Sequence, residues 1–91
     1  MEKDVEINVD YLPAAKPFHQ EYPGVTTLST VRADAMSFFQ VRDFQDRNNH
    51  QFFLEFNHQR LAANGETLTQ LLGHREGAKF NLVEQITPGA H

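Results

Sequence analysis

Residues 27–40 read TLSTVRADAMSFFQ, and this stretch decides the fold. Its apolar side chains recur at the spacing of one helical face, at Leu28, Val31, Ala35, Phe38 and Phe39. The side-chain hydroxyl of Thr26 or Thr27 can cap a helix by accepting a backbone N–H. The pattern therefore predicts one main helix from about Leu28 to Gln40, and the rest of the chain must pack around it.

Two stretches before the helix alternate between apolar and polar residues with period two, which is typical of half-buried strands. The first runs from Val5 to Tyr11 and the second from Phe18 to Tyr22. The segment 12–17 contains two prolines, and proline cannot donate to a central ladder, so it separates the strands. This short connection favours a hairpin, which Pro23-Gly24 ends.

After the helix, residues 42–50 are mostly polar and predict a loop. The aromatic segment Gln51–Phe56 predicts a third strand, with Leu54 and Phe56 facing the core. A turn at 57–59 would lead to a short fourth strand over Arg60–Ala62.

The C-terminal third predicts one helical turn and one long strand. Thr67–Leu72 is compatible with a single helical turn that Gly73 closes, and Lys79–Ile86 predicts the last strand. With one main helix, all strands must join a single sheet whose apolar face that helix covers. The first and last strands can lie side by side in its middle. We therefore expect an α+β chain of the β-grasp type, with a domain over residues 1–86 and a flexible polar tail over 87–91.

Composition narrows the classes of function. The 91 residues are enough for one domain, and the 40% hydrophobic share with eight Phe excludes a disordered chain. The net charge of −4 cannot provide the basic face that nucleic acid requires. No polybasic or long apolar run predicts contact with a membrane. The absence of cysteine fits a reducing compartment, so we expect a cytoplasmic protein.

Catalytic and metal-binding motifs are missing from the sequence. Without cysteine there is no thiol nucleophile or thiolate ligand, and the five histidines show no HxxxH or HExxH spacing. Ser29 and Ser37 lack the glycines of a nucleophile elbow, and no glycine-rich phosphate loop occurs. The sequence therefore predicts no enzyme activity, no cofactor and no metal site.

Three short sequence segments resemble segments of ubiquitin and occur in the same order along the chain. TLSTVRA at 27–33 resembles TIENVKA, NGETLT at 64–69 resembles DGRTLSD, and NLVEQITPG at 81–89 resembles HLVLRLRGG. In the last segment, six residues follow the Leu-Val pair up to the final glycine in both proteins. The resemblance covers most of the chain at low identity, and it implies the ubiquitin-like form of the β-grasp.

The length and the extended segment before the third strand look most like the bacterial ubiquitin-like modifiers of antiviral operons. That resemblance implies three enzyme partners: an activating enzyme, a conjugating enzyme and a deubiquitinase-like peptidase. It also implies that Ala90 and His91 are processed away, that Gly89 is conjugated to target proteins, and that residues 85–88 (Gln85, Ile86, Thr87 and Pro88) are recognised as a tail. A glycine suits this chemistry because a residue without a Cβ passes most easily through a narrow enzyme channel.

The sequence also departs from ubiquitin. Pro88-Gly89 stands in place of a double glycine, and Gln85 and Thr87 replace two arginines. Glu55 falls near the central isoleucine of ubiquitin's apolar patch, of which Val83 retains one member. Readers of eukaryotic ubiquitin are therefore expected to bind poorly.

Phe53 and Glu55 should face away from the helix and form, with Val83, a partner surface. Phe53 could instead pack under the 42–50 segment. The last five residues could also be an ordinary frayed terminus. A further alternative for the whole protein is a non-conjugated ubiquitin-like binding module or an assembly subunit, which would use the same sheet face and never form an isopeptide bond.

Overall fold

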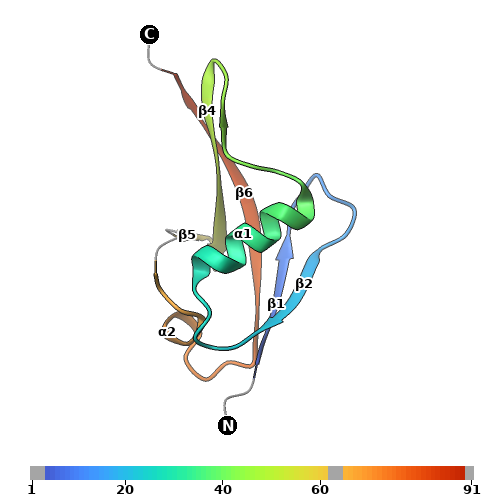
Figure 1. Cartoon of the computed structure of the whole chain (residues 1–91), viewed down its shortest axis with the longest axis vertical. Helices are drawn as coiled ribbons and strands as arrows, with labels where there is room; N and C mark the ends of the chain where they lie inside the picture. Colours follow the sequence, from blue (N-terminus) through green and yellow to red (C-terminus); the bar gives the residue numbers. More distant parts are fainter. Residues whose placement is uncertain (1–3, 62–64, 90–91) are drawn as a thin grey trace.

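One sheet wraps around one main helix in the computed structural model, which describes residues 4–61 and 65–89 (Figure 1). The elements follow in the order β1 (Val5–Asp10), β2 (Phe18–Tyr22), α1 (Leu28–Phe39), β3 (Phe44–Gln45), β4 (Asn48–Phe56), β5 (Gln59–Leu61), α2 (Leu68–Leu72) and β6 (Gly77–Pro88). The strands lie in the order β2-β1-β6-β4-β3, and β5 pairs with β4. β1 and β6 are parallel neighbours in the middle, while the other pairs are antiparallel. The predicted mixed sheet with one main helix is confirmed.

Helix α1 begins where the sequence predicts, with the Thr27 side chain accepting from the backbone N–H of Thr30. It ends at Phe39 because Gln40 adopts the left-handed conformation, with φ at 59°. The predicted apolar stripe is wrong at Phe38, which is 51% exposed, while Met36 is buried. Phe38 lies against Phe18 at the start of the edge strand β2, where the sheet stops covering the helix (ring centroids 5.3 Å apart).

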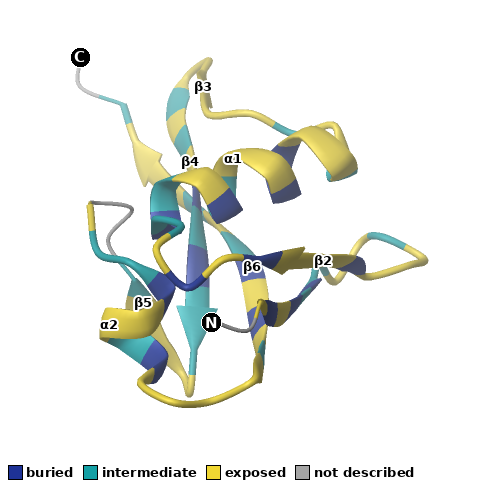
Figure 2. Cartoon of the chain, turned by 60° about the horizontal axis from the view of Figure 1, so that its bottom comes forward, coloured by how far each residue is buried: buried dark blue, intermediate teal, exposed yellow. Residues whose placement is uncertain are grey.

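The core lies between α1 and the facing side of the sheet, where Figure 2 shows the buried bands. Alternate residues of each long strand point into it, so the buried strand residues include Ile7, Val9, Phe80 and Leu82. Of the predicted core residues, Leu54 is buried and Phe56 is only half-buried beside Phe80. Of the predicted helical stripe, Leu28, Val31 and Ala35 are buried, and Leu68 on α2 and Leu82 on β6 are buried with them.

The predicted loop over residues 42–50 is wrong, because this segment forms a second hairpin. β3 pairs antiparallel with the start of β4, which begins at Asn48 rather than at Gln51. The hairpin is tied to the domain through Asp43, which accepts from the Phe52 N–H at 2.8 Å and contacts Arg32 at 2.5 Å. Arg32 also donates to the Phe52 carbonyl at 2.8 Å. The charged segment therefore has fixed partners on both α1 and β4.

Strand β6 is longer than predicted at both ends and runs from Gly77 to Pro88. Its last residues pair with the early part of β4, as Asn49 with Thr87 and Asn48 with Pro88. The predicted boundary between domain and tail therefore falls inside β6, where Thr87 and Pro88 are paired with β4. The physical reason is that the unforeseen start of β4 offers these residues a partner strand.

Three paired segments together form what we call the ribbon. They are strand β3, residues 46–51 of the second hairpin and residues 84–89 of the tail. The ribbon extends beyond the end of α1 in the direction of β6, and the molecule measures 52 × 27 × 21 Å (Figure 1). Most ribbon residues are exposed or half-buried.

The short elements agree with the sequence patterns. Asn57 and His58 both adopt positive φ, as a tight two-residue hairpin requires, and β5 follows directly. Helix α2 begins with a capping box between Thr67 and Gln70 and ends at Gly73. The predictions for Ala62 and Asn64 fall outside the described residues.

Candidate functional site

The predicted conjugation residue Gly89 lies at the far tip of the ribbon. Its backbone N–H donates to the carbonyl oxygen of Arg47 at 3.2 Å. A Cβ added to Gly89 would overlap that oxygen and lie 3.2 Å from the carbonyl carbon. Glycine is therefore required here by close backbone approach, independently of any enzyme channel. The expected processed residues Ala90 and His91 lie outside the described residues.

Pro88 fits the ladder in spite of its missing N–H. The Gly89–Arg47 bond makes these two residues a hydrogen-bonded pair, and such pairs alternate with non-hydrogen-bonded pairs along antiparallel strands. The neighbouring pair of Pro88 with Asn48 is then non-hydrogen-bonded, so an N–H at residue 88 would point away from β4. β1 pairs with β6 only as far as Asn81, so the missing donor faces solvent at an edge.

His50 joins the two sides of the ribbon through its ring nitrogens. Nδ1 lies 2.8 Å from Oε2 of Glu84 on β6, and Nε2 lies 3.1 Å from Oδ1 of Asp46 in the hairpin turn. The ring also stacks on Phe44 of β3, with centroids 4.0 Å apart and planes at 8°. The His50 side chain is only 12% exposed although it sits outside the main core.

These contacts shift the pKa values of His50 and Asp46 in opposite directions. The hydrogen bond to Glu84, helped by Asp46, raises the pKa of His50 against a smaller opposing effect of burial. The backbone N–H of Asn48, followed by His50, lowers the pKa of Asp46. Both carboxylates can accept only when each imidazole nitrogen carries a proton, so the geometry suits a cationic His50.

The predicted partner surface lies on the sheet face opposite α1, as expected. Phe53 stands directly across from Val83, and Glu55 is two residues further along β4. All three are half-buried. The alternative that Phe53 packs under the 42–50 segment finds no support, because that segment forms its own hairpin at the other end of β4.

Arg60 covers this surface. Its guanidinium carbon lies 5.0 Å from the centroid of the Phe53 ring, and Nη1 donates to Oε1 of Gln85. It is also paired with Glu55 across β4 and β5. The patch is thus an apolar pair beneath a cation rather than an open hydrophobic face.

The four predicted tail residues divide between the two faces of β6. Gln85 lies on the Phe53 face and donates from its amide to the hydroxyl of Thr87 at 3.4 Å. Ile86 is on the His50 face, directly across from His50, and is 54% exposed. Because side chains alternate along a strand, a partner lying on one face can read only every second residue.

The sequence reasoning missed Arg60, Arg47 and the His50 cluster. The contacts that tie these residues to the C-terminal part of the chain join positions 25 to 42 apart, and each depends on the register between β4, β5 and β6. No local pattern in the sequence encodes that register. The Phe44–His50 pair was accessible in principle, since an aromatic and a histidine flank the Asp46-Arg47 turn at hairpin spacing.

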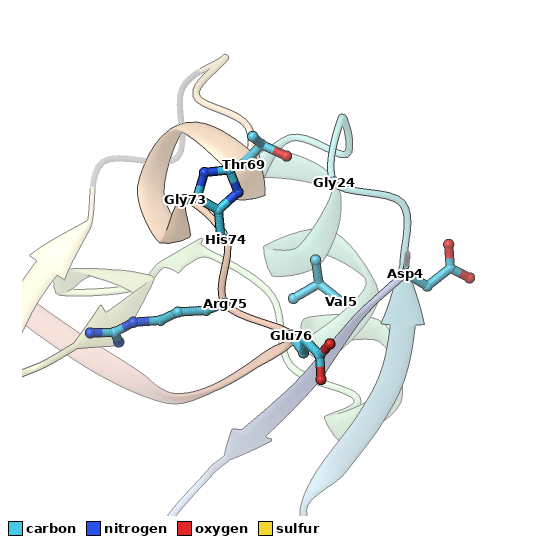
Figure 3. Close-up of a pocket in the computed structure, with 8 residues that line it drawn as sticks. All are labelled: Asp4, Val5, Gly24, Thr69, Gly73, His74, Arg75 and Glu76. Carbon is cyan, nitrogen blue, oxygen red and sulfur yellow. The ribbon is translucent and has the colours of Figure 1, made fainter. Parts of the chain in front are cut away.

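A pocket of about 300 Å³ lies at the opposite end of the molecule, where β1 begins and the chain leaves α2 (Figures 1 and 3). Figure 3 shows the side chains of Asp4, Arg75 and Glu76 pointing in different directions rather than converging. A ligand site normally brings a few polar groups together. This pocket therefore gives no chemical reason to place the function there.

No group of three or more His, Asp or Glu side chains within 4–61 and 65–89 is arranged to hold a metal ion. Among these same residues, no helix has the length and apolar character needed to cross a membrane.

Solved structures resemble this chain closely in fold. The ubiquitin of Caldiarchaeum subterraneum superposes with a TM-score of 0.70 at 22% identity, over 94% of this chain and 99% of that one. A structure described as molecular mimicry of SUMO that promotes DNA repair gives 0.65 at 14% identity, over 91% and 94%. The fold is ubiquitin-like.

An N-terminal ubiquitin-like domain solved in solution also matches, with a TM-score of 0.63 at 13% identity, over 100% of this chain and 84% of that one. Neither a protein-family model nor a curated protein matches the sequence. Identities of this size establish the ubiquitin-like fold and leave function to be argued from the residues.

Proposed function

We propose that this ubiquitin-like protein is a modifier whose tail is trimmed to Gly89, activated and joined to target proteins. The observation that carries the proposal is the position of Gly89. β6 leaves the core at Leu82 and runs past the end of α1, so the glycine sits at an extremity of the molecule. An enzyme can approach that end without meeting the body of the domain.

The protein would then be a substrate of enzymes and would perform no chemistry of its own. Its partners would be an activating enzyme, a conjugating enzyme and a deubiquitinase-like peptidase. These enzymes are encoded in the antiviral operons of the bacterial ubiquitin-like modifiers that the sequence resembles. The cytoplasm is the compartment in which those enzymes would meet it. Residues 85–88 would be read by them as an extended segment, and the Phe53–Val83 pair would provide a lateral contact.

A second candidate is a ubiquitin-like binding module that is never conjugated. One specific observation favours it: the backbone of Gly89 is already engaged by Arg47, and Thr87 and Pro88 are paired with β4. In this alternative the glycine serves only to close the ribbon. The two candidates predict different masses for the mature protein.

Trimming is tested by intact-mass spectrometry of the protein produced together with the three enzymes of an operon that encodes it. We expect a species that ends at Gly89, because a β-carbon and an imidazole would have to enter a channel suited to glycine. Thioester or isopeptide adducts should form through that residue. A chain that retains His91 in every species, without adducts, would favour the binding module.

The partner surface is tested by Phe53→Asp. The substitution replaces the aromatic member of the apolar Phe53–Val83 pair with a charge, so we expect binding to the activating enzyme to weaken about tenfold or more, a usual effect for an interface anchor. Isothermal titration calorimetry measures it. The control is Leu12→Asp, which changes a side chain that is 98% exposed at the end of β1. Equal affinities for the two variants would remove Phe53 from the surface.

A further inference from the structure

The ribbon is held together with little help from the hydrophobic core. Among its strand residues, Phe44 is 44% exposed and Ile86 is 54% exposed. Helix α1 ends before this part of the sheet (Figure 1). The end of β6 is held by the β4–β6 ladder, the Gly89–Arg47 hydrogen bond, the His50 cluster and the hydrogen bond from Arg60 to Gln85. Segments with few buried apolar contacts open locally at low free energy. The end of β6 is therefore the part of the sheet most easily released.

We propose that the β3–β4 hairpin is a clasp that keeps the tail paired with β4, and that the charge of His50 helps to hold it closed. The clasp consists of the hairpin segment 43–50 and the tail segment 84–89. When it is closed, Gly89 lies against the Arg47 backbone and is not free to enter an enzyme channel. When it opens, residues 84–89 lose their pairing with β4 and become an unpaired extended segment that an enzyme can bind.

The charges around His50 make its protonation matter. Glu84 faces the ring from β6, and Asp46 faces it from the hairpin turn, so an imidazolium bridges the two halves of the clasp. The neighbouring Asp43 is occupied by Arg32 and by the Phe52 N–H, on the side of the hairpin nearer to α1. A neutral imidazole has one N–H, so it can donate to one of the two carboxylates and must turn a lone pair toward the other.

The sign of the pH dependence follows from the folded-state shifts. His50 has its pKa raised in the closed clasp, so the stability that it contributes is complete below its open-state value and is lost as the pH rises through the closed-state value. Asp46 has its pKa lowered, so its contribution is lost as the pH falls through that lowered value. With ordinary values near 3.9 for Asp and 6.5 for His, closure is strongest at roughly pH 5 to 6 and weakens above neutrality.

The role of the clasp in controlling access to Gly89 rests on the proposed function, but the clasp itself does not. Its opening is a property of the protein alone and can be measured without any partner. A chain that is never conjugated would still show it. Failure of conjugation and failure of the clasp are therefore separate results.

Amide hydrogen exchange followed by NMR tests the clasp, with protection factors used to remove the intrinsic effect of pH. We expect protection at Thr87 and Gly89 to fall about two- to fivefold between pH 5.5 and 7.5, which is the scale of exposed ion pairs. The Leu82 amide lies beside the core on the same strand and should keep its protection. The His50 ring should titrate with its pKa above the ordinary value.

Two variants separate the charge from the packing. His50→Phe retains a ring that can stack on Phe44 but lacks both donors. Protection at Gly89 in this variant should no longer change with pH. At every pH it should be no higher than the protection that the wild type shows at pH 7.5. His19→Phe is the matched control, because His19 is an exposed strand histidine whose partner is the neutral Asn8. It should leave the pH profile unchanged.

A third variant holds the clasp shut. Asn49 and Thr87 are cross-strand partners at a spacing that a disulfide can bridge, and the chain has no native cysteine to interfere. The oxidised Asn49→Cys/Thr87→Cys protein should keep high protection at Gly89 across the whole pH range. Wild-type protection that does not vary with pH, or a His50→Phe profile identical to wild type, would overturn the proposal.

Discussion

Under the proposed modifier function, Gly89→Glu should abolish every covalent adduct of this protein when it is produced with an activating and a conjugating enzyme. The side chain would block passage of the terminal carboxylate through a channel suited to glycine, and no neighbouring residue could replace it, since Pro88 and Ala90 both carry a Cβ. Adducts are scored on denaturing gels and by mass spectrometry. This is the largest effect that we expect on function, from full conjugation to none.

The structure complicates the reading of that experiment, because any side chain at residue 89 also meets the Arg47 carbonyl. Gly89→Ala provides the comparison, since it disturbs the same contact with the smallest possible group. The control is Gly65→Ala, where an added Cβ would find nothing within 4 Å. All three proteins should melt at nearly the same temperature, because Gly89 lies at the tip of the ribbon and far from the core. Adducts that survive Gly89→Glu would refute conjugation through this residue.

Leu82→Ala should have the largest effect on stability. Leu82 is 3% exposed, stands across from Leu54 on β4, and belongs to the cluster between α1 and the sheet. Truncation of such a leucine costs about 2–5 kcal/mol, against a total of about 5–15 kcal/mol for a small domain. Because 1 kcal/mol shifts the melting temperature of a domain this small by about 4–8 °C, we expect a drop of roughly 10 °C or more.

Thermal unfolding followed by circular dichroism measures this effect. Leu12→Ala is the matched control, because Leu12 is 98% exposed and its truncation should fall within about 0.5 kcal/mol of wild type. An unchanged melting temperature for Leu82→Ala would mean that β6 does not present residue 82 to the core. The strand assignment on which the position of Gly89 depends would then be lost as well.

The parts of the fold that could be predicted are those whose residues face a core. Ile7, Val31 and Leu82 each belong to a stretch with a regular apolar period, and each is buried where the period places it. The Thr27 cap and the paired positive-φ residues Asn57 and His58 follow from local chemistry alone. Such features depend on a few consecutive residues, so a single sequence contains them.

The ribbon could not be predicted by the same reasoning. Both of its faces meet solvent, so β3 and the start of β4 have no alternation of apolar and polar residues, and the polar run Arg47-Asn48-Asn49 resembles a loop. The extension of β6 to Pro88 depends in turn on that hairpin. A proline near the chain end suggested a break, but in a non-hydrogen-bonded edge position it costs no ladder bond.

The sequence indicated where the candidate site residues lie, but not which residues contact them. The sequence placed Phe53 and Val83 on one face and singled out Gly89, and the register of β4 with β6 brings the first two together. It could not indicate that Arg60 covers Phe53 or that Arg47 engages Gly89. Both contacts arise from cross-strand pairing, which is a property of the whole sheet.

The parallel pairing of β1 with β6 also decides how the molecule responds to mechanical force. Glu6 pairs with Gly77 and Asp10 with Asn81, so a load applied between the start of β1 and Gly89 pulls the two strands along their own length. The hydrogen bonds of that ladder are then loaded together in shear, whereas peeling would break them one at a time. Breaking them together presents a free-energy barrier, and the rate of crossing this barrier governs forced unfolding. Traction on Gly89 along β6 therefore loads the β1–β6 and β4–β6 ladders in shear together.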